Sequence, residues 1–236
     1  MNKNLFSTKN LSLYLIVSIV LWVVTMIWSM ADVKPGWDQI DYVQKVMKFE
    51  PSFIITYINA TLLTLLVIAL FWKLFLHFST QNRGLSEAAL FFLLIYGTIN
   101  LVAYGSQLVV LPVLSNKIFE TDLSPDDIAM VYHWIQMAPG TKIATANGFA
   151  YAALGIPSII FGLMMMKINR FGKIAGWLFI ANAIACMLGF WGMLANIPVM
   201  QFGTAIGGVI FLAAVVYLFL MIKTNSSGME QTPADQ

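Results

Sequence analysis

Apolar residues form long uninterrupted stretches of this chain, and the charged residues fall between them. Five windows contain no Asp, Glu, Lys or Arg: residues 10–31, 51–72, 88–116, 143–166 and 174–222. A helix needs about 20 apolar residues to cross the roughly 30 Å hydrocarbon core of a membrane. Each of the first four windows therefore fits one span, whereas the fifth is long enough for two.

The last window contains Pro198 near its middle, with Asn196 and Gln201 close to it. Because proline interrupts a helix, we expect two spans joined by a turn at residues 195–200. The sequence thus predicts an all-α fold, a polytopic transmembrane bundle of six helices that forms a single domain over residues 1–223. The predicted spans lie near residues 11–31, 53–76, 88–112, 143–166, 174–194 and 200–222. Pro112 is expected to end the third span, and residues 224–236 are expected to form a disordered cytoplasmic tail.

The composition agrees with a membrane protein, since 59% of the residues are hydrophobic and 10% are charged. Soluble proteins contain about 25% charged residues. The first span is also a candidate secretory signal, because Ser29-Met30-Ala31 resembles a cleavage site. The apolar stretch from Leu11 to Met30 exceeds the core of about 7–15 residues of such a signal, which favours a retained span. Cleavage would leave five spans.

The distribution of basic residues predicts the orientation, because Lys and Arg in short connections favour the cytoplasm. One side collects Lys3, Lys9, Lys73, Arg83, Lys167, Arg170, Lys173 and Lys223. The other side has only Lys34, Lys45, Lys48, Lys117 and Lys142, which share their two loops with most of the acidic residues. We therefore expect both termini in the cytoplasm and the two loops, residues 32–52 and 113–142, on the outer face.

Each outer loop contains the apolar period of a short amphipathic helix. The first period is Trp37, Ile40, Val43 and Met47, and the second is Ile128, Val131, Tyr132 and Ile135. Ser124-Pro125-Asp126-Asp127 is a strong helix start, with a capping hydroxyl, a proline and two acids. Pro139-Gly140 should end this segment. Two short amphipathic helices can lie in the lipid interface, the simpler interpretation, or fold over the bundle mouth as a lid.

A polar stripe marks the third predicted span, where Tyr96, Asn100, Tyr104 and Gln107 are spaced by four, four and three residues. Polar residues of the second and fourth spans would meet this stripe near the bundle axis. The resulting candidate polar pocket contains Asn59, Tyr96, Asn100, Tyr104, Gln107, Asn147 and Tyr151. The alternative is that these side chains join helices by hydrogen bonds, which average about 0.6 kcal/mol in membranes. A cavity of roughly 300 Å³ would indicate a pocket, and direct pairing would indicate helix joining.

Small residues recur at spacings typical of close helix packing: Gly172 and Gly176, Gly203 and Gly207, and Ala144, Gly148 and Ala152. Besides the lipid bilayer, possible partners are therefore a second copy of the chain or another membrane protein. No nucleic acid is expected, because the chain lacks a basic domain. No metal or other cofactor is expected, because the two histidines, His77 and His133, are predicted on opposite sides of the membrane. The spans contain no ionisable catalytic set, so we expect no enzyme.

The chain resembles a broad group of uncharacterised six-span bacterial membrane proteins that are known only as a domain of unknown function. The resemblance rests on the long outer loop after the first span, the Gly/Ala-rich fourth span, the basic turn MKINRFGKIAGW at residues 166–177 and the closing hairpin. It implies a bacterial cytoplasmic (inner) membrane and supplies no catalytic residues. We expect a non-catalytic structural or accessory membrane protein. The alternatives are a transporter or binder of a small neutral or amphiphilic solute or lipid, and third an intramembrane enzyme.

Overall fold

The computed structural model describes residues 7–34, 36–119 and 124–229, which form helices and no strands. The long helices are α1 (Thr8–Met30), α3 (Pro51–Phe78), α4 (Arg83–Phe119), α6 (Lys142–Met165), α7 (Arg170–Leu194) and α9 (Gly203–Met229). The short ones are α2 (Gln39–Met47), α5 (Pro125–His133) and α8 (Pro198–Gln201). Six helical segments of the described chain are long and apolar enough to cross a membrane, which confirms the predicted six-helix bundle.

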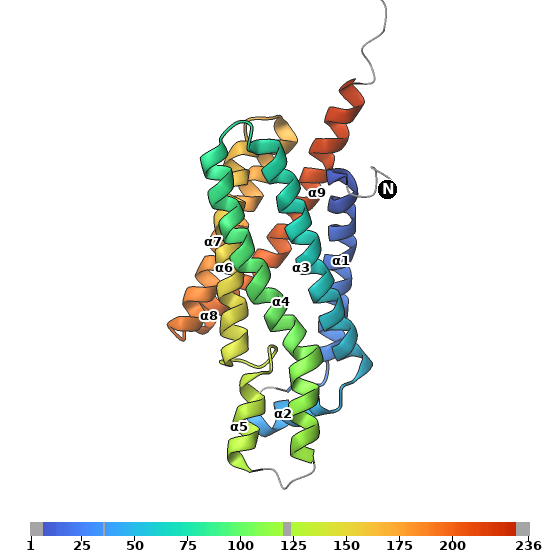
Figure 1. Ribbon diagram of the computed structural model, residues 1–236, viewed down its shortest axis with the longest axis vertical. Coiled ribbons are helices and arrows are strands. Elements are labelled where there is room, and N and C mark those ends of the chain that lie inside the picture. Colours follow the sequence, from blue (N-terminus) through green and yellow to red (C-terminus); the bar gives the residue numbers. More distant parts are fainter. Residues whose placement is uncertain (1–6, 35, 120–123, 230–236) are drawn as a thin grey trace, which may run out of the picture.

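The long helices pack in chain order into a closed ring, because each contacts the next and α9 returns to α1. The start of α1 and the end of α9 lie at the same end of the molecule (Figure 1), as an even number of spans requires. We call this the termini end and the opposite one the outer end. Towards the termini end the ring is filled by aromatic side chains: Phe71, Phe161, Phe179 and Phe211, with ring centroids 5.7 to 6.5 Å apart.

Helix α4 does not end at residue 112 as predicted, because Pro112 lies inside it. Proline removes one backbone donor, and this loss is offset here by packing on both sides of the residue. Leu111 and Ser115 are both completely buried. With about 1.5 Å of rise per residue, the 37 residues of α4 extend about 55 Å, far more than the roughly 30 Å of hydrocarbon. The last turns of α4 therefore project from the outer end.

Helix α9 also continues past its expected end at residue 222 and runs to Met229. The Thr224 hydroxyl donates to the carbonyl oxygens of Leu220 and Met221, at 3.1 and 3.0 Å. Residues 224–229 are thus helical, where a disordered tail was expected. Residues 230–236 of that tail lie outside the described part of the chain.

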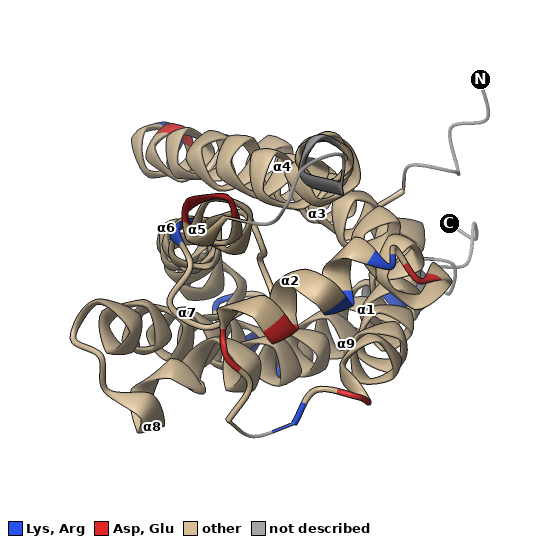
Figure 2. Cartoon of the chain, turned by 90° about the horizontal axis from the view of Figure 1, so that it is seen from below, with Lys and Arg blue, Asp and Glu red and all other residues tan. Residues whose placement is uncertain are grey.

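Helices α2 and α5, with the α5–α6 connection, cover the outer end of the bundle, and we call these segments the outer cap. Figure 2, viewed from this end, shows α2 lying across the mouth and α5 over α6. The predicted helix start is confirmed, because Ser124 accepts the backbone N–H of Asp127 and Pro125 begins α5. The apolar side chains of the cap point into the protein. Val43 and Val46 of α2, Val131 of α5 and Ile135 of the α5–α6 connection are at most 1% exposed. This geometry favours the lid over interfacial anchoring.

The predicted glycine motifs lie in helix contacts inside one chain. A Cβ atom at Gly176 of α7 would overlap the carbonyl oxygen of Gly162 in α6. A Cβ at Gly207 of α9 would lie 2.6 Å from the sulfur of Cys186 in α7. These glycines allow α6, α7 and α9 to approach closely. An oligomer formed through the same spans stays a prediction.

Candidate functional site

The polar side chains beneath the outer cap form hydrogen bonds directly with one another. They come from α3, α4, α6 and the α5–α6 connection, and we call them the outer polar cluster: Tyr57, Asn100, Tyr104, Gln107, Gln136, Asn147 and Tyr151. Five of these residues belong to the predicted polar pocket: Asn100, Tyr104, Gln107, Asn147 and Tyr151. The geometry of the cluster decides between a pocket and helix joining.

A series of side-chain hydrogen bonds connects the cap with the interior of the bundle. Tyr57 donates its hydroxyl to Gln136 Oε1 at 3.0 Å. Gln136 Nε2 in turn donates to Asn147 Oδ1 at 3.1 Å. Asn147 Nδ2 then donates to Asn100 Oδ1 at 2.7 Å, a buried bond that joins α6 to α4. The series ends at Asn100 Nδ2, a buried donor with no hydrogen-bond partner among the described residues.

Gln107 ties the cap to α4. Its Nε2 donates to the backbone carbonyl oxygen of Trp134 at 2.8 Å, and its Oε1 accepts the backbone N–H of Gln136 at 3.0 Å. The side-chain amide of Gln107 therefore pairs with both a backbone carbonyl and a backbone N–H of the α5–α6 connection, where no helical hydrogen bonds satisfy these groups. Such groups are costly to bury unpaired, so this contact fixes the position of the α5–α6 connection.

A second contact between α4 and α6 joins two tyrosines, whose hydroxyls Tyr104 and Tyr151 lie 2.7 Å apart. Tyr96 packs its ring against Tyr151, with the ring centroids 5.8 Å apart. The predicted stripe of α4 is thus entirely buried, and all four of its residues face the interior: Tyr96, Asn100, Tyr104 and Gln107.

Asn59 lies apart from the other predicted pocket residues, in the contact between α1 and α3. Ser18 donates its hydroxyl to Asn59 Oδ1, and Asn59 Nδ2 donates to the carbonyl oxygen of Ser18, both at 2.9 Å. Asn59 therefore shares no hydrogen bond with the outer polar cluster. It joins α1 to α3 instead.

Two depressions open on the sides of the bundle, one of about 550 Å³ and one of about 290 Å³. Neither is lined by Asn100, Tyr104 or Gln107, and only the smaller one touches a predicted pocket residue, Asn59. The side-chain contacts within the outer polar cluster are direct pairs, which is the geometry of helix joining.

Residues 12–223 match the model of a family described as a domain of unknown function, DUF4386. The chain belongs to this family. No curated protein and no solved structure matches it. Family membership and the six apolar segments together identify an integral, multi-pass membrane protein of the DUF4386 family.

The sequence analysis missed two residues of this DUF4386 protein: Gln136, which belongs to the outer polar cluster, and Ser18, which pairs with Asn59. Gln136 lies in a connection after α5, where no helical period marks a buried position. Ser18 is a single hydroxyl in an apolar span, and its partner is 41 residues away. The only available signal for Gln136 was its position next to the apolar Ile135. A polar residue beside an apolar one is too common to predict a contact.

Charged groups of the described chain gather outside this cluster. Lys45 on α2 donates to Asp32 at 3.0 Å and to Glu50 at 2.7 Å, which ties both ends of the first outer loop together. Burial alone would lower the pKa of Lys45, but hydrogen bonds and charge from Glu50 and Asp32 together raise it above the ordinary value. Among the described residues no three His, Cys, Asp or Glu side chains are placed to hold a metal ion.

Proposed function

We propose that this DUF4386 protein is a non-catalytic structural or accessory component of the cytoplasmic membrane, with both termini in the cytoplasm. One observation carries the proposal: the amide side chains of the outer polar cluster form hydrogen bonds between helices and to the cap. Asn147 reaches Asn100 at 2.7 Å, and Gln107 holds the cap backbone at 2.8 and 3.0 Å. Direct pairing of these amides supports a structural role over a solute pocket.

The alternative function is transport or binding of a small neutral or amphiphilic solute or lipid in the bundle, and an intramembrane enzyme ranks third. An experimental density map of the full chain in lipid nanodiscs distinguishes the structural role from transport or binding. The structural role predicts a dry contact between α4 and α6. Non-protein density between Asn100 and Asn147, separating the two amides, would contradict it and favour transport.

The orientation rests on the basic residues at the termini end, such as those of the turn between α6 and α7. Reporter fusions after Arg83, after Arg170 and at the C-terminus should all report the cytoplasm. An exported signal at Arg170 would overturn the proposed topology, whatever the result of the density map.

A further inference from the structure

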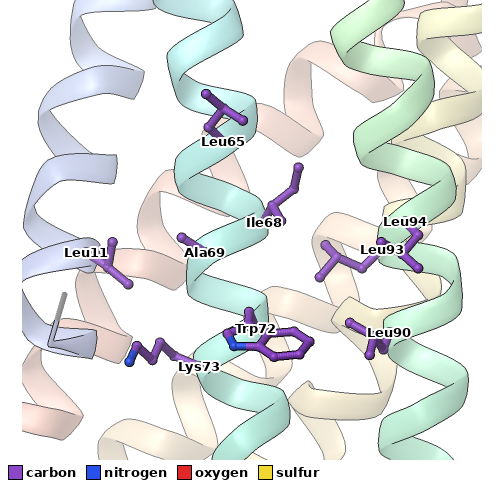
Figure 3. A pocket seen from close by; sticks show the side chains of 9 residues that line it. All are labelled: Leu11, Leu65, Ile68, Ala69, Trp72, Lys73, Leu90, Leu93 and Leu94. Carbon is purple, nitrogen blue, oxygen red and sulfur yellow. The ribbon is translucent and has the colours of Figure 1, made fainter.

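A groove of about 550 Å³ follows the lipid-facing side of α3 near the termini end (Figure 3). Helix α3 forms its floor, and α1 and α4 form its two walls, because both pack against α3. The lining residues are Leu11 of α1, Leu65, Ile68, Ala69, Trp72 and Lys73 of α3, and Leu90, Leu93 and Leu94 of α4. All but Lys73 present apolar or aromatic surface, so the groove suits an acyl chain.

The groove extends along α3 over most of one membrane leaflet. Its lining residues on this helix run from Leu65 to Lys73, a rise of about 12 Å at 1.5 Å per residue. Half of the roughly 30 Å hydrocarbon core is about 15 Å. A chain that starts at the level of Lys73 would therefore end near the middle of the bilayer.

A single charge marks one end of this apolar groove. Lys73 has no ion-pair partner among the described residues, whereas Arg83 and Glu87 at the start of α4 pair with each other at 2.8 Å. A lysine at this depth extends its ammonium group toward the membrane surface while its stem stays in apolar surroundings. Trp72 beside it is 44% exposed and can place its indole N–H at the headgroup level.

We propose that this groove binds one anionic phospholipid from the leaflet at the termini end. One acyl chain lies on Leu65, Ile68 and Ala69, and the ammonium group of Lys73 binds the headgroup. The charge selects an anionic headgroup over a zwitterionic one, because an added cation in the latter repels Lys73. The groove is separate from the outer polar cluster, so the site does not depend on the structural role proposed above.

The test is a competition on the full-length protein in detergent, with equal amounts of phosphatidylglycerol and phosphatidylcholine of identical acyl chains. Native mass spectrometry measures the ratio of the two lipids bound per protein. We expect phosphatidylglycerol to be preferred, and Lys73→Gln to lower the ratio about fivefold, since one lysine near an anionic membrane surface contributes about 1 kcal/mol. Lys167→Gln is the matched control, because it removes the same charge at the same end from an exposed turn.

A second variant, Ala69→Phe, places a ring on the groove floor and should reduce binding of both lipids while the protein still elutes as a folded species. An unchanged lipid ratio in Lys73→Gln would overturn the proposal. So would an equal loss in Lys167→Gln, which would indicate unspecific attraction to surface charge. If Ala69→Phe instead converts a dimer into a monomer without changing lipid binding, the groove holds a second copy of the chain, and the lipid proposal is wrong.

Discussion

The pair formed by Asn100 and Asn147 allows a quantitative test of helix joining in the bundle. Asn147 makes two hydrogen bonds to other segments, one to Asn100 at 2.7 Å and one from Gln136 at 3.1 Å. Asn100 makes only the first of these through its side chain, because its Nδ2 has no partner. Replacement by leucine keeps the approximate volume and removes the polar atoms, so it isolates the hydrogen bonds.

The expected magnitudes follow from the number of bonds lost. Side-chain hydrogen bonds between membrane helices average about 0.6 kcal/mol, with a maximum of about 1.7. Asn100→Leu should therefore lower the free energy of unfolding by about 0.6 kcal/mol and Asn147→Leu by about 1.2 kcal/mol. The double variant loses the same two bonds as Asn147→Leu alone. It should cost about 1.2 kcal/mol rather than the additive 1.8, a coupling of about 0.6 kcal/mol.

The assay is reversible unfolding of the purified protein in mixed micelles, followed by tryptophan fluorescence. Asn59→Leu serves as the control, because Asn59 bonds only to Ser18 in the contact between α1 and α3. Its effect should add to that of Asn147→Leu without coupling. Strict additivity of Asn100→Leu and Asn147→Leu, or no loss of stability in either, would show that the two amides do not join the helices. If neither substitution lowers the stability but the response to a solute changes, the two amides line a pocket.

Two further predictions concern the glycine contacts and the cap. Gly176→Ala should destabilise the protein by about 1–3 kcal/mol, because the added Cβ atom would meet the backbone of Gly162. Gly208→Ala is the control and should not destabilise the protein, because the space around Gly208 is open. Equal thermal stability of the two variants would refute the close contact. The pKa of Lys45 is raised on folding, so its ion pairs contribute fully below the ordinary value of 10.5 and are lost as the pH rises through the folded value. The difference in thermal stability between the parent protein and Lys45→Gln should therefore shrink only above pH 10.5, and a difference that is constant across this range would contradict the role of the charge.

Much of the architecture could be predicted because it depends on local signals. Charge-free windows give the spans, since burying a charge in lipid is costly wherever the helix packs. The start of α5 is equally local, because Ser124 and Pro125 cap the helix with groups a few residues away. The stripe from Tyr96 to Gln107 depends only on the period of one helix, and its four residues do share a buried face.

The remaining features depend on contacts between distant segments. Pro112 is a reasonable helix end in isolation, but the cap packs around the residues beside it and the helix continues. Asn59 was grouped with the pocket as a polar residue of the second predicted span, yet its partner is Ser18 of α1. The order of helices around the ring decides which side chains meet, and a single sequence contains no measure of that order.

The outer cap is the part of the molecule that most resembles a moving lid, and its contacts argue that it belongs to the fold. Opening it into water would expose Val43, Val46, Val131 and Ile135, which are at most 1% exposed. At about 1.5 kcal/mol for each side chain, the lower end of the range, this costs about 6 kcal/mol. Every 1.4 kcal/mol is a factor of about ten in population, so fewer than about one molecule in ten thousand would be open. Insertion of the apolar faces into lipid would remove this cost, but the two bonds from Gln107 to the cap backbone would still be lost. A closed cap thus follows from packing and hydrogen bonding together, which agrees better with a structural component than with a gate that opens in every cycle.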